Sequence, residues 1–207
     1  MDTAANADAL NERIVAFLRD RIGRLGPDDS GAWDYYVARL EHGHGLSHYD
    51  RVLYDMFGAG DAVCHVGIGF GTLTSALAAK GVRCVGFENH PARFDGAVEL
   101  AERLDVGVCL DLRCESFPQG LRETDRTEGA TLLFTNFGAT TQDGVEESII
   151  DSFHRFARVI LDLRLFCKTR NEAAERDDLH GRILARGFAS TEEPAIAGHY
   201  FRTFTPA

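Results

Sequence analysis

Three glycines at alternate positions separate a short apolar run from a segment of helical periodicity. The apolar run is Ala62–Val66, the glycines are Gly67, Gly69 and Gly71, and the helical segment is Thr72–Lys80, with Gly81 as its stop signal. Glycine is favoured where a strand turns tightly into a helix and where a ligand approaches the backbone without a Cβ in the way. This strand–loop–helix unit predicts an α/β domain, in which the loop either binds a nucleotide-like ligand or is only a tight turn between strand and helix.

The alternation of β-rich and helical segments continues along the rest of the chain. The further expected strands are Val82–Glu88, a run near Val106–Leu112, Ala130–Asn136 and Leu161–Cys167, and the expected helices are Pro91–Leu104, Val145–Val159 and Asn171–Ala185. The last two runs, around Ala195–Ile196 and Tyr200–Phe204, flank Gly198-His199, which predicts an antiparallel hairpin at the sheet edge. We therefore predict an α/β fold with a seven-stranded, mostly parallel twisted sheet, an antiparallel C-terminal hairpin and helices on both faces.

Residues 1–60 are expected to form a helical N-terminal extension. Leu10–Leu25 and Trp33–Leu40 have helical periodicity, Gly26-Pro27 separates them, and Ser47 or Asp50 is placed to cap a helix through Phe57. We expect this extension to act as a lid over the ligand, and residues 61–207 to form the ligand-binding domain.

Composition narrows the possible partners. The 207 residues carry 22 Lys and Arg against 32 Asp and Glu, and the resulting net charge of −10 repels a phosphate backbone. The apolar runs are too short to span a bilayer, and the N-terminal residues do not resemble a signal peptide. Five scattered cysteines without a CxxC motif indicate neither disulfides nor zinc. We expect a cytoplasmic protein that binds neither nucleic acid nor membranes, with a homodimer as an open possibility.

Glu88 closes the second expected strand, next to the glycine loop in a parallel sheet. A carboxylate at the end of this strand is placed to accept hydrogen bonds from both hydroxyls of a ribose. The alternative interpretation is a solvated acid at a strand end. Thr72 stands where the dinucleotide fingerprint GxGxxG has its third glycine, which favours a different ligand.

The segment His65-Val66-Gly67-Ile68-Gly69-Phe70-Gly71, followed by an acid at the end of the second strand, resembles the class I S-adenosylmethionine-dependent methyltransferases. Their first motif reads acidic-x-Gly-x-Gly-x-Gly, and the resemblance covers residues 61–207, including the terminal hairpin. It implies a Rossmann-like domain that binds S-adenosyl-L-methionine as cofactor.

The resemblance also implies roles for individual residues. The methionine and ribose part of the cofactor would lie over Gly67, Gly69 and Gly71, and Glu88 would hold the ribose. The adenine would have Asn89 as a neighbour, and the adenine and its amino group would be flanked by Cys114, Glu115 and Ser116. Asn136 would face cofactor and substrate. His65 stands where the family has an acid, and a neutral imidazole brings no negative charge to the cofactor's ammonium. The alternative interpretation is that His65 is a histidine within the strand whose side chain is hydrogen-bonded to other groups of the protein.

The substrate side of the site is less defined. Asn136-Phe137-Gly138 is not the Asn/Asp-Pro-Pro-aromatic tetrapeptide of many amino-group methyltransferases of nucleic acid, which favours a small-molecule substrate. Tyr49, His48 and Asn136 are the candidate catalytic residues, to orient or deprotonate this substrate. His42, His44 and His48 lie in a stretch interrupted by glycines, and we predict no metal site there.

The predicted function is methyl transfer from S-adenosylmethionine to a small metabolite by in-line displacement. Two alternatives remain open at this stage. One is an enzyme of the same fold that transfers or cyclises the aminobutyrate arm and releases methylthioadenosine. The other is a noncatalytic S-adenosylmethionine-binding module.

Overall fold

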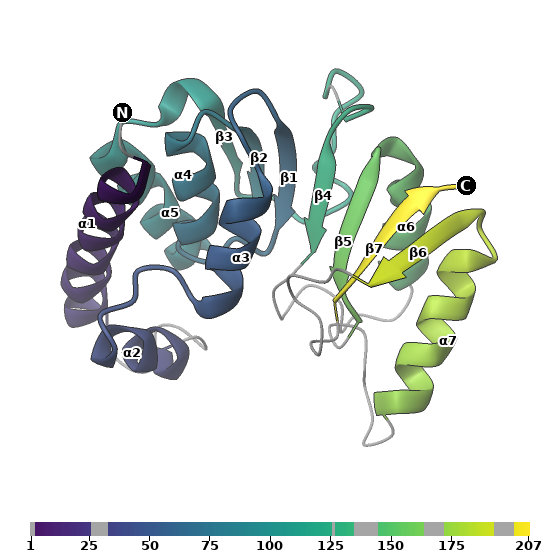
Figure 1. The fold of residues 1–207 in the computed structure, drawn as a ribbon, viewed down its shortest axis with the longest axis horizontal. Helices are drawn as coiled ribbons and strands as arrows, with labels where there is room; N and C mark the ends of the chain where they lie inside the picture. The colour runs from purple at the N-terminus through teal and green to yellow at the C-terminus, as the bar shows by residue number, and fades with distance from the viewer. Residues whose placement is uncertain (1–2, 26–32, 126, 135–144, 164–171, 193–200) are drawn as a thin grey trace.

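The structure is a computed structural model that describes residues 3–25, 33–125, 127–134, 145–163, 172–192 and 201–207. Its strands are β1 (Ala62–Val66), β2 (Arg83–Phe87), β3 (Leu110–Arg113), β4 (Thr131–Phe134), β5 (Arg158–Asp162), β6 (Phe188–Glu192) and β7 (Phe201–Pro206). They form one sheet of seven strands in the order β3-β2-β1-β4-β5-β7-β6. The first five strands are parallel, whereas β7 runs antiparallel to both β5 and β6 (Figure 1). The predicted sheet with its antiparallel hairpin is confirmed.

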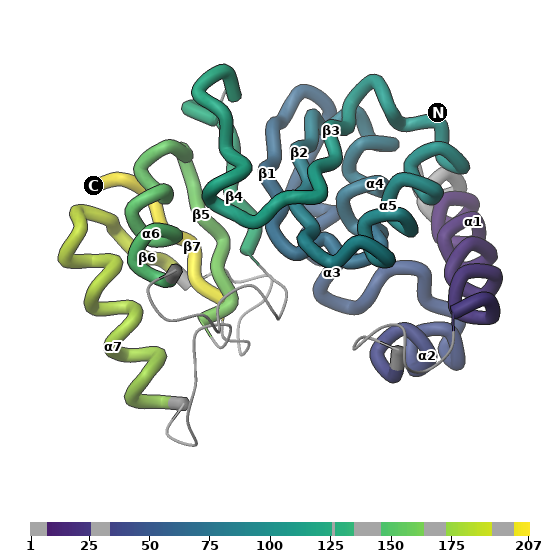
Figure 2. Tube along the Cα trace, turned by 180° about the vertical axis from the view of Figure 1, so that it is seen from behind, coloured from purple at the N-terminus to yellow at the C-terminus, as the bar shows by residue number. Residues whose placement is uncertain are grey.

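The helices are α1 (Thr3–Arg24), α2 (Trp33–Glu41), α3 (His48–Met56), α4 (Thr72–Ala79), α5 (Pro91–Leu104), α6 (Val145–Ser152) and α7 (Glu172–Leu184), with short 3-10 turns η2 (Gly107–Cys109) and η3 (Phe153–Arg155). Figure 2 shows the same arrangement from behind, with α1 to α5 gathered beside β1, β2 and β3, and α6 and α7 beside β5, β6 and β7.

Both faces of the sheet are buried, each under its own set of helices. Successive side chains of a strand point to opposite faces. Val63 and Leu133 pack on one face with side chains of α1 to α5, whereas Cys64 and Leu132 pack on the other with side chains of α6 and α7. The predicted placement of helices on both faces is therefore confirmed. All four residues of β4 are buried, as the apolar run of this central strand predicts.

The predicted helix Val145–Val159 is wrong at its C-terminal end. Helix α6 ends at Ser152, and β5 begins at Arg158, so that Val159 pairs with Leu132 of β4. The apolar residues continue at helical spacing across this boundary without glycine or proline, and the pattern therefore gave no stop signal. Pairing with the buried strand β4 overrides the local periodicity.

Two other strand boundaries are also corrected. The first hairpin strand is Phe188–Glu192, not the run around Ala195–Ile196, which lies outside the described residues. Phe188 is buried on the α6 and α7 face, but it is followed by small and polar residues that make the strand inconspicuous in the sequence. The third strand begins at Leu110, because Gly107–Cys109 forms a 3-10 turn in place of its expected first residues.

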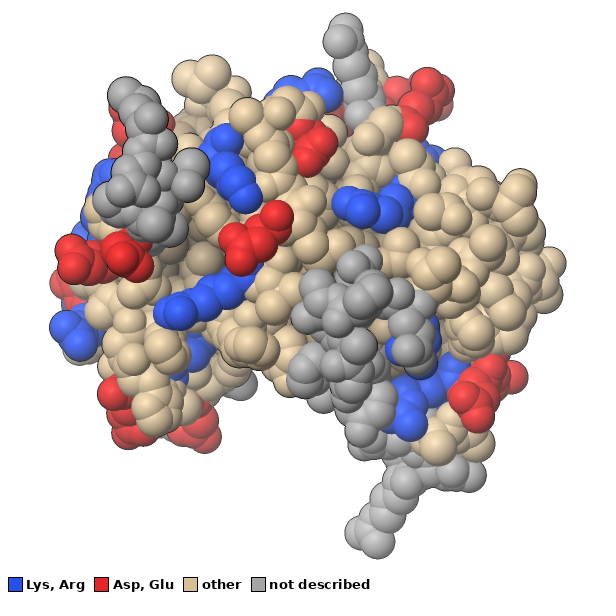
Figure 3. Space-filling model, in the orientation of Figure 1, with Lys and Arg blue, Asp and Glu red and all other residues tan. Residues whose placement is uncertain are grey.

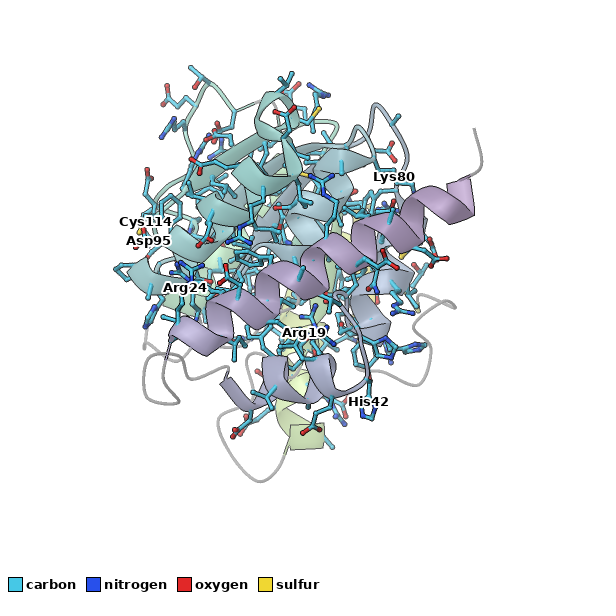
Figure 4. The ribbon with its side chains drawn as sticks, turned by 90° about the vertical axis from the view of Figure 1, so that its left-hand side faces the viewer. Arg19, Arg24, His42, Lys80, Asp95 and Cys114 are labelled. Carbon is cyan, nitrogen blue, oxygen red and sulfur yellow. The ribbon has the colours of Figure 1, made fainter. Side chains whose placement is uncertain are left out.

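The three N-terminal helices pack beside α4 and α5. Helix α3 begins with a capping box in which the Ser47 side chain accepts the Asp50 N–H and the Asp50 carboxylate accepts the Ser47 N–H, each at 3.0 Å. This confirms Ser47 as the helix cap. Figure 4 shows α1 crossing this side of the molecule, with α2 below it. Lys80, which follows α4, is labelled above α1, on the other side of α1 from α2.

Among the described residues, no helix combines the length and the apolar character that crossing a bilayer requires.

Candidate functional site

The candidate site lies at the carboxyl ends of the parallel strands, where the connections change direction. Strand β1 lies between β2 and β4, so the chain leaves β1 toward one edge of the sheet and later returns to the other side of β1. Such a switch point is where open α/β sheets bind their ligands. The glycine loop Gly67–Gly71 follows β1 at this point.

The glycine loop has a left-handed backbone at each glycine. The φ angles of Gly67, Gly69 and Gly71 are +71°, +59° and +68°, which residues with a Cβ rarely adopt. The N–H groups of Gly67 and Ile68 both donate to the carbonyl of Phe87, at 2.9 and 3.2 Å. These bonds fix the turn against the end of β2, and the left-handed φ angles explain why glycine is needed here even without a ligand.

Glu88 lies directly against the glycine loop. Its Oε2 accepts the Gly69 N–H at 2.8 Å, and its Oε1 accepts the His90 N–H at 3.0 Å. The residue is only 5% exposed. A carboxylate offers about four acceptor positions, so these two bonds leave capacity for further donors. Glu88 thus has the position and the chemistry to bind two hydroxyls of a ribose.

Tyr36 of α2 occupies the space beside Gly69. The Tyr36 hydroxyl accepts the Phe70 N–H at 3.1 Å, and a Cβ built on Gly69 would lie only 2.5 Å from that hydroxyl. Burial raises the pKa of Tyr36 to about 12, so its phenol is neutral at ordinary pH. The Tyr36 hydroxyl therefore occupies the space that a Cβ on Gly69 would take. A ligand at the loop would share this space with Tyr36.

Gly71 has a different neighbour. A Cβ at this position would lie 3.0 Å from the Cβ of Ala97 in α5, and Gly71 is the N-cap of α4. Its lack of a side chain thus permits the close approach of α4 and α5. This packing explains why position 71 is glycine, and the predicted place of Gly71 under the cofactor is not needed for that explanation.

His65 points toward helix α4. Its Nδ1 lies 2.8 Å from the Thr74 hydroxyl, and the residue is 3% exposed. Burial lowers the pKa of His65 to about 4, although the nearby Asp50 carboxylate opposes this shift. The imidazole is therefore neutral near pH 7. The described contact ties β1 to α4, as expected of a histidine with a structural hydrogen bond.

The predicted adenine-flanking residues lie on the surface near the end of the sheet. Asn89 follows β2, and Cys114, Glu115 and Ser116 follow β3, and all four are exposed. Glu115 pairs with the exposed Arg122 at 3.5 Å. Their position leaves them accessible to a ligand at the carboxyl ends of β2 and β3.

Arg113 holds the connection that follows β3, a role that the sequence did not suggest. Its guanidinium donates two hydrogen bonds to Asp125, at 2.7 and 2.8 Å, and a third at 2.9 Å to the Gly120 carbonyl. The Arg113 and Asp125 side chains are only 3% and 8% exposed. A single arginine at a strand end has no sequence signal that identifies a partner 12 residues away.

The candidate catalytic residues are only partly brought to this edge. Tyr49 of α3 packs against Phe201, with ring centroids 6.0 Å apart, and Phe201 pairs with Asp162 at the carboxyl end of β5. His48 is exposed beside Tyr49, at 5.8 Å between ring centroids. Asn136 lies outside the described residues.

Histidines of the loop after α2 do not assemble with other ligands. The Nδ1 of His44 accepts a hydrogen bond from Arg51 at 2.7 Å, which leaves that nitrogen occupied. Within the described ranges, no three His, Cys, Asp or Glu residues are grouped closely enough to hold a metal ion.

Comparison with known proteins identifies the fold. The sequence matches no protein-family model, and no curated protein is significantly similar to it. The structure is similar to a TehB-like SAM-dependent methyltransferase from Corynebacterium glutamicum, with a TM-score of 0.59 and 13% identity over 86% of this chain and 98% of that one.

Two further solved structures show the same likeness. A precorrin-6y C5,15-methyltransferase from Geobacter metallireducens has a TM-score of 0.51 and 12% identity, covering 74% of this chain and 85% of its own. TrmK of M. capricolum, in complex with S-adenosyl-homocysteine, has a TM-score of 0.51 and 8% identity over 77% and 67%. At these identities, the likeness establishes the fold.

Proposed function

Because the chain has the class I Rossmann-like fold of S-adenosylmethionine-dependent methyltransferases, we propose that it transfers the methyl group of S-adenosyl-L-methionine to a small-molecule metabolite. One observation carries the proposal. The buried Glu88 carboxylate is bonded to the Gly69 N–H at the switch point of the sheet, where this fold leaves room for a ligand.

The residues present fit this cofactor at its ribose end. Glu88 accepts one N–H on each oxygen and keeps acceptor capacity for two hydroxyls. At the other end, His65 stands where the family has an acid, and its ring is neutral and lies 2.8 Å from the Thr74 hydroxyl, so His65 itself brings no negative charge to an ammonium. When bound, the cofactor supplies a sulfonium whose methyl carbon is activated for displacement.

The protein's own contribution is alignment and exclusion of water. Glu88 fixes the ribose, and the loop amides that hold Glu88 and Tyr36 keep this wall of the site rigid. In-line displacement gains most from such positioning, and a base is needed only when the attacking atom carries a proton. Tyr49, His48 and Asn136 remain the proposed groups for orienting or deprotonating the acceptor, and residues 1–60 remain the proposed lid.

The charge of the chain favours a small acceptor. The neighbours by fold include a precorrin methyltransferase as well as a structure described as an rRNA methylase, so the fold alone leaves the acceptor open. The net charge is −10, and Figure 3 shows the basic and acidic side chains of the described residues interspersed over the drawn face, where these residues form no continuous basic area. Nucleic acid binding depends on such an area.

Product identification tests the proposal. The purified protein is incubated with S-adenosylmethionine and candidate metabolites, and the sulfur-containing product is identified by mass spectrometry. S-adenosylhomocysteine that forms only with an acceptor supports methyl transfer. Methylthioadenosine would indicate chemistry at the aminobutyrate arm instead, and unchanged cofactor with measurable binding would indicate a noncatalytic module.

A further inference from the structure

A cavity of about 900 Å³ lies near the amino ends of β2 and β3, at the opposite end of these strands from the candidate site. One wall comes from Lys80, which follows α4, and from the turn of residues 105–109 that leads into β3. Leu10 and Arg13 of α1 and Tyr54 and Asp55 of α3 contribute the other walls. Lys80 marks this region in Figure 4, above α1. We call it the amino-end cavity.

Val108 protrudes at the rim of the amino-end cavity. It lies in the 3-10 turn η2 and is fully exposed, more so than any other large apolar side chain in the described part of the chain. A single exposed apolar residue is ordinary on a protein surface. Val108, however, adjoins a recess whose walls include the buried side chains of Leu104 and Val106. An apolar projection and a recess with apolar walls thus lie side by side on one surface.

The same surface carries two cations and two acids. The cations are Arg13 and Lys80, and each of them donates to a backbone carbonyl near the end of a helix, α5 and α3 respectively. The acids are Asp55 and Asp105, and both are exposed. Among the residues that the structure describes, none of the four takes part in an ion pair. Both signs of charge at the amino-end cavity are therefore available to a partner.

The backbone of Asp105 indicates that its carboxylate has a use. Asp105 is the C-cap of α5, with φ +57° and ψ +49°, and it is the one residue other than glycine with a positive φ in the described ranges. Glycine takes this left-handed conformation without strain and is the usual residue at such a helix end. Aspartate tolerates it at some cost. A strained residue whose charge meets no partner within the described chain is expected to meet one outside it.

We propose that the amino-end cavity and Val108 form a twofold interface between two copies of this chain. Val108 of each copy enters the cavity of the other, and the cations of each copy face the acids of the other. A projection beside a recess satisfies both halves of a twofold contact. A partner of one charge sign would leave two of the four charged groups facing like charge, whereas a second copy pairs all of them. Both candidate sites stay open, because they lie at the other end of the strands.

The test measures self-association of the purified full chain by sedimentation equilibrium. Val108→Glu places a charge on the projection, and Asp105→Asn removes one charge while keeping a residue that tolerates the left-handed backbone. The matched control is Leu184→Glu, because Leu184 is 40% exposed and ends α7, which packs on the other face of the sheet. Urea unfolding of each variant reports whether its fold is intact.

We expect the wild-type chain to be a dimer. Val108→Glu should raise the dimer dissociation constant about 100-fold or more, because each dimer loses the burial of two valines. Asp105→Asn should raise it about 10-fold and reduce its dependence on salt, because two exposed ion pairs are lost. Leu184→Glu should leave it unchanged.

A wild-type chain that stays monomeric up to about 1 mM would overturn the proposal and would leave the amino-end cavity to a small molecule or to a different protein. A dimer that withstands both Val108→Glu and Asp105→Asn, or one that Leu184→Glu weakens equally, would also overturn it. Because Asp105→Asn keeps the shape of the side chain, its result decides the matter if Val108→Glu does not fold.

Discussion

The Gly69 N–H donates a 2.8 Å hydrogen bond to the carboxylate of Glu88 and thereby joins the middle of the glycine loop to the end of the neighbouring strand. The two residues lie on different strand ends, 19 positions apart in the chain. Because the bond uses one of the carboxylate's acceptor positions, Glu88 is fixed in orientation and still able to bind a ligand.

Replacing Glu88 by glutamine should weaken binding of S-adenosylhomocysteine by about 1.5–3 kcal/mol, the range for a hydrogen bond to a charged group. The amide has nearly the shape of the carboxylate but only one acceptor oxygen, and calorimetry with chemical denaturation on the same sample separates affinity from stability. Unaltered affinity in a folded variant would remove Glu88 from the site. Glutamine keeps an acceptor for only one of the Gly69 and His90 N–H groups, whereas Glu88→Ala leaves both without an acceptor and is therefore a poorer test.

Gly69→Ala should destabilise the chain by about 2 kcal/mol or more, through its left-handed backbone and through collision with the Tyr36 hydroxyl. Tyr36→Phe removes the colliding oxygen and leaves the Phe70 N–H unpaired. The double variant should therefore lose about 1 kcal/mol less than the sum of the single losses. Urea unfolding of all four chains measures this coupling, and strict additivity would contradict the contact between Gly69 and Tyr36.

The pH dependence of stability should reveal the burial of His65. Its pKa is about 4 in the folded chain against 6.5 as the reference value, so below pH 6.5 the unfolded chain binds more protons than the folded one. The free energy of unfolding therefore rises with pH between about 4 and 6.5, and the contribution of His65 at pH 7 is lost as the pH falls, by about 3 kcal/mol at pH 4.

His65→Gln isolates this contribution, because the variant keeps a polar side chain but does not titrate. The difference in unfolding free energy between the wild-type chain and His65→Gln should shift in favour of the variant by about 3 kcal/mol from pH 7 to pH 4. Parallel curves over this range would show that His65 is not buried in the neutral form.

Arg113→Met should cost about 3–5 kcal/mol of stability, because it leaves the buried Asp125 carboxylate without its cation. The control is Arg122→Met, which removes a 56% exposed arginine and should change stability by no more than about 0.5 kcal/mol. Thermal unfolding of both variants gives the comparison. Equal and small effects would contradict the anchoring role of Arg113.

Local sequence signals predicted much of this molecule. The apolar run of β1 and the glycines after it predicted both the strand bounds and the turn, because they are consecutive in the chain and act through backbone conformation. The boundary between α6 and β5 was not predictable in this way, since Val159 has the same apolar character in either element and only its pairing with Leu132 decides between them.

The site was predictable only where its residues lie beside a motif. The place of Glu88 in the candidate site was predicted directly from its position at the end of the second strand. Tyr36 and Arg39 reach the loop and helix α4 from 34 and 33 residues away, through the packing of α2, and no local pattern signals such contacts. The need for glycine at position 71 likewise comes from close packing against Ala97, which is distant in the sequence.

The central claim is that the Gly67–Gly71 loop and Glu88 hold the adenosyl ribose, and a crystal structure of the chain with S-adenosylhomocysteine tests it most directly. We predict both ribose hydroxyls within hydrogen-bond distance of the Glu88 carboxylate, with the loop beneath the ligand. A ligand bound elsewhere, or a ribose turned away from Glu88, would contradict the claim.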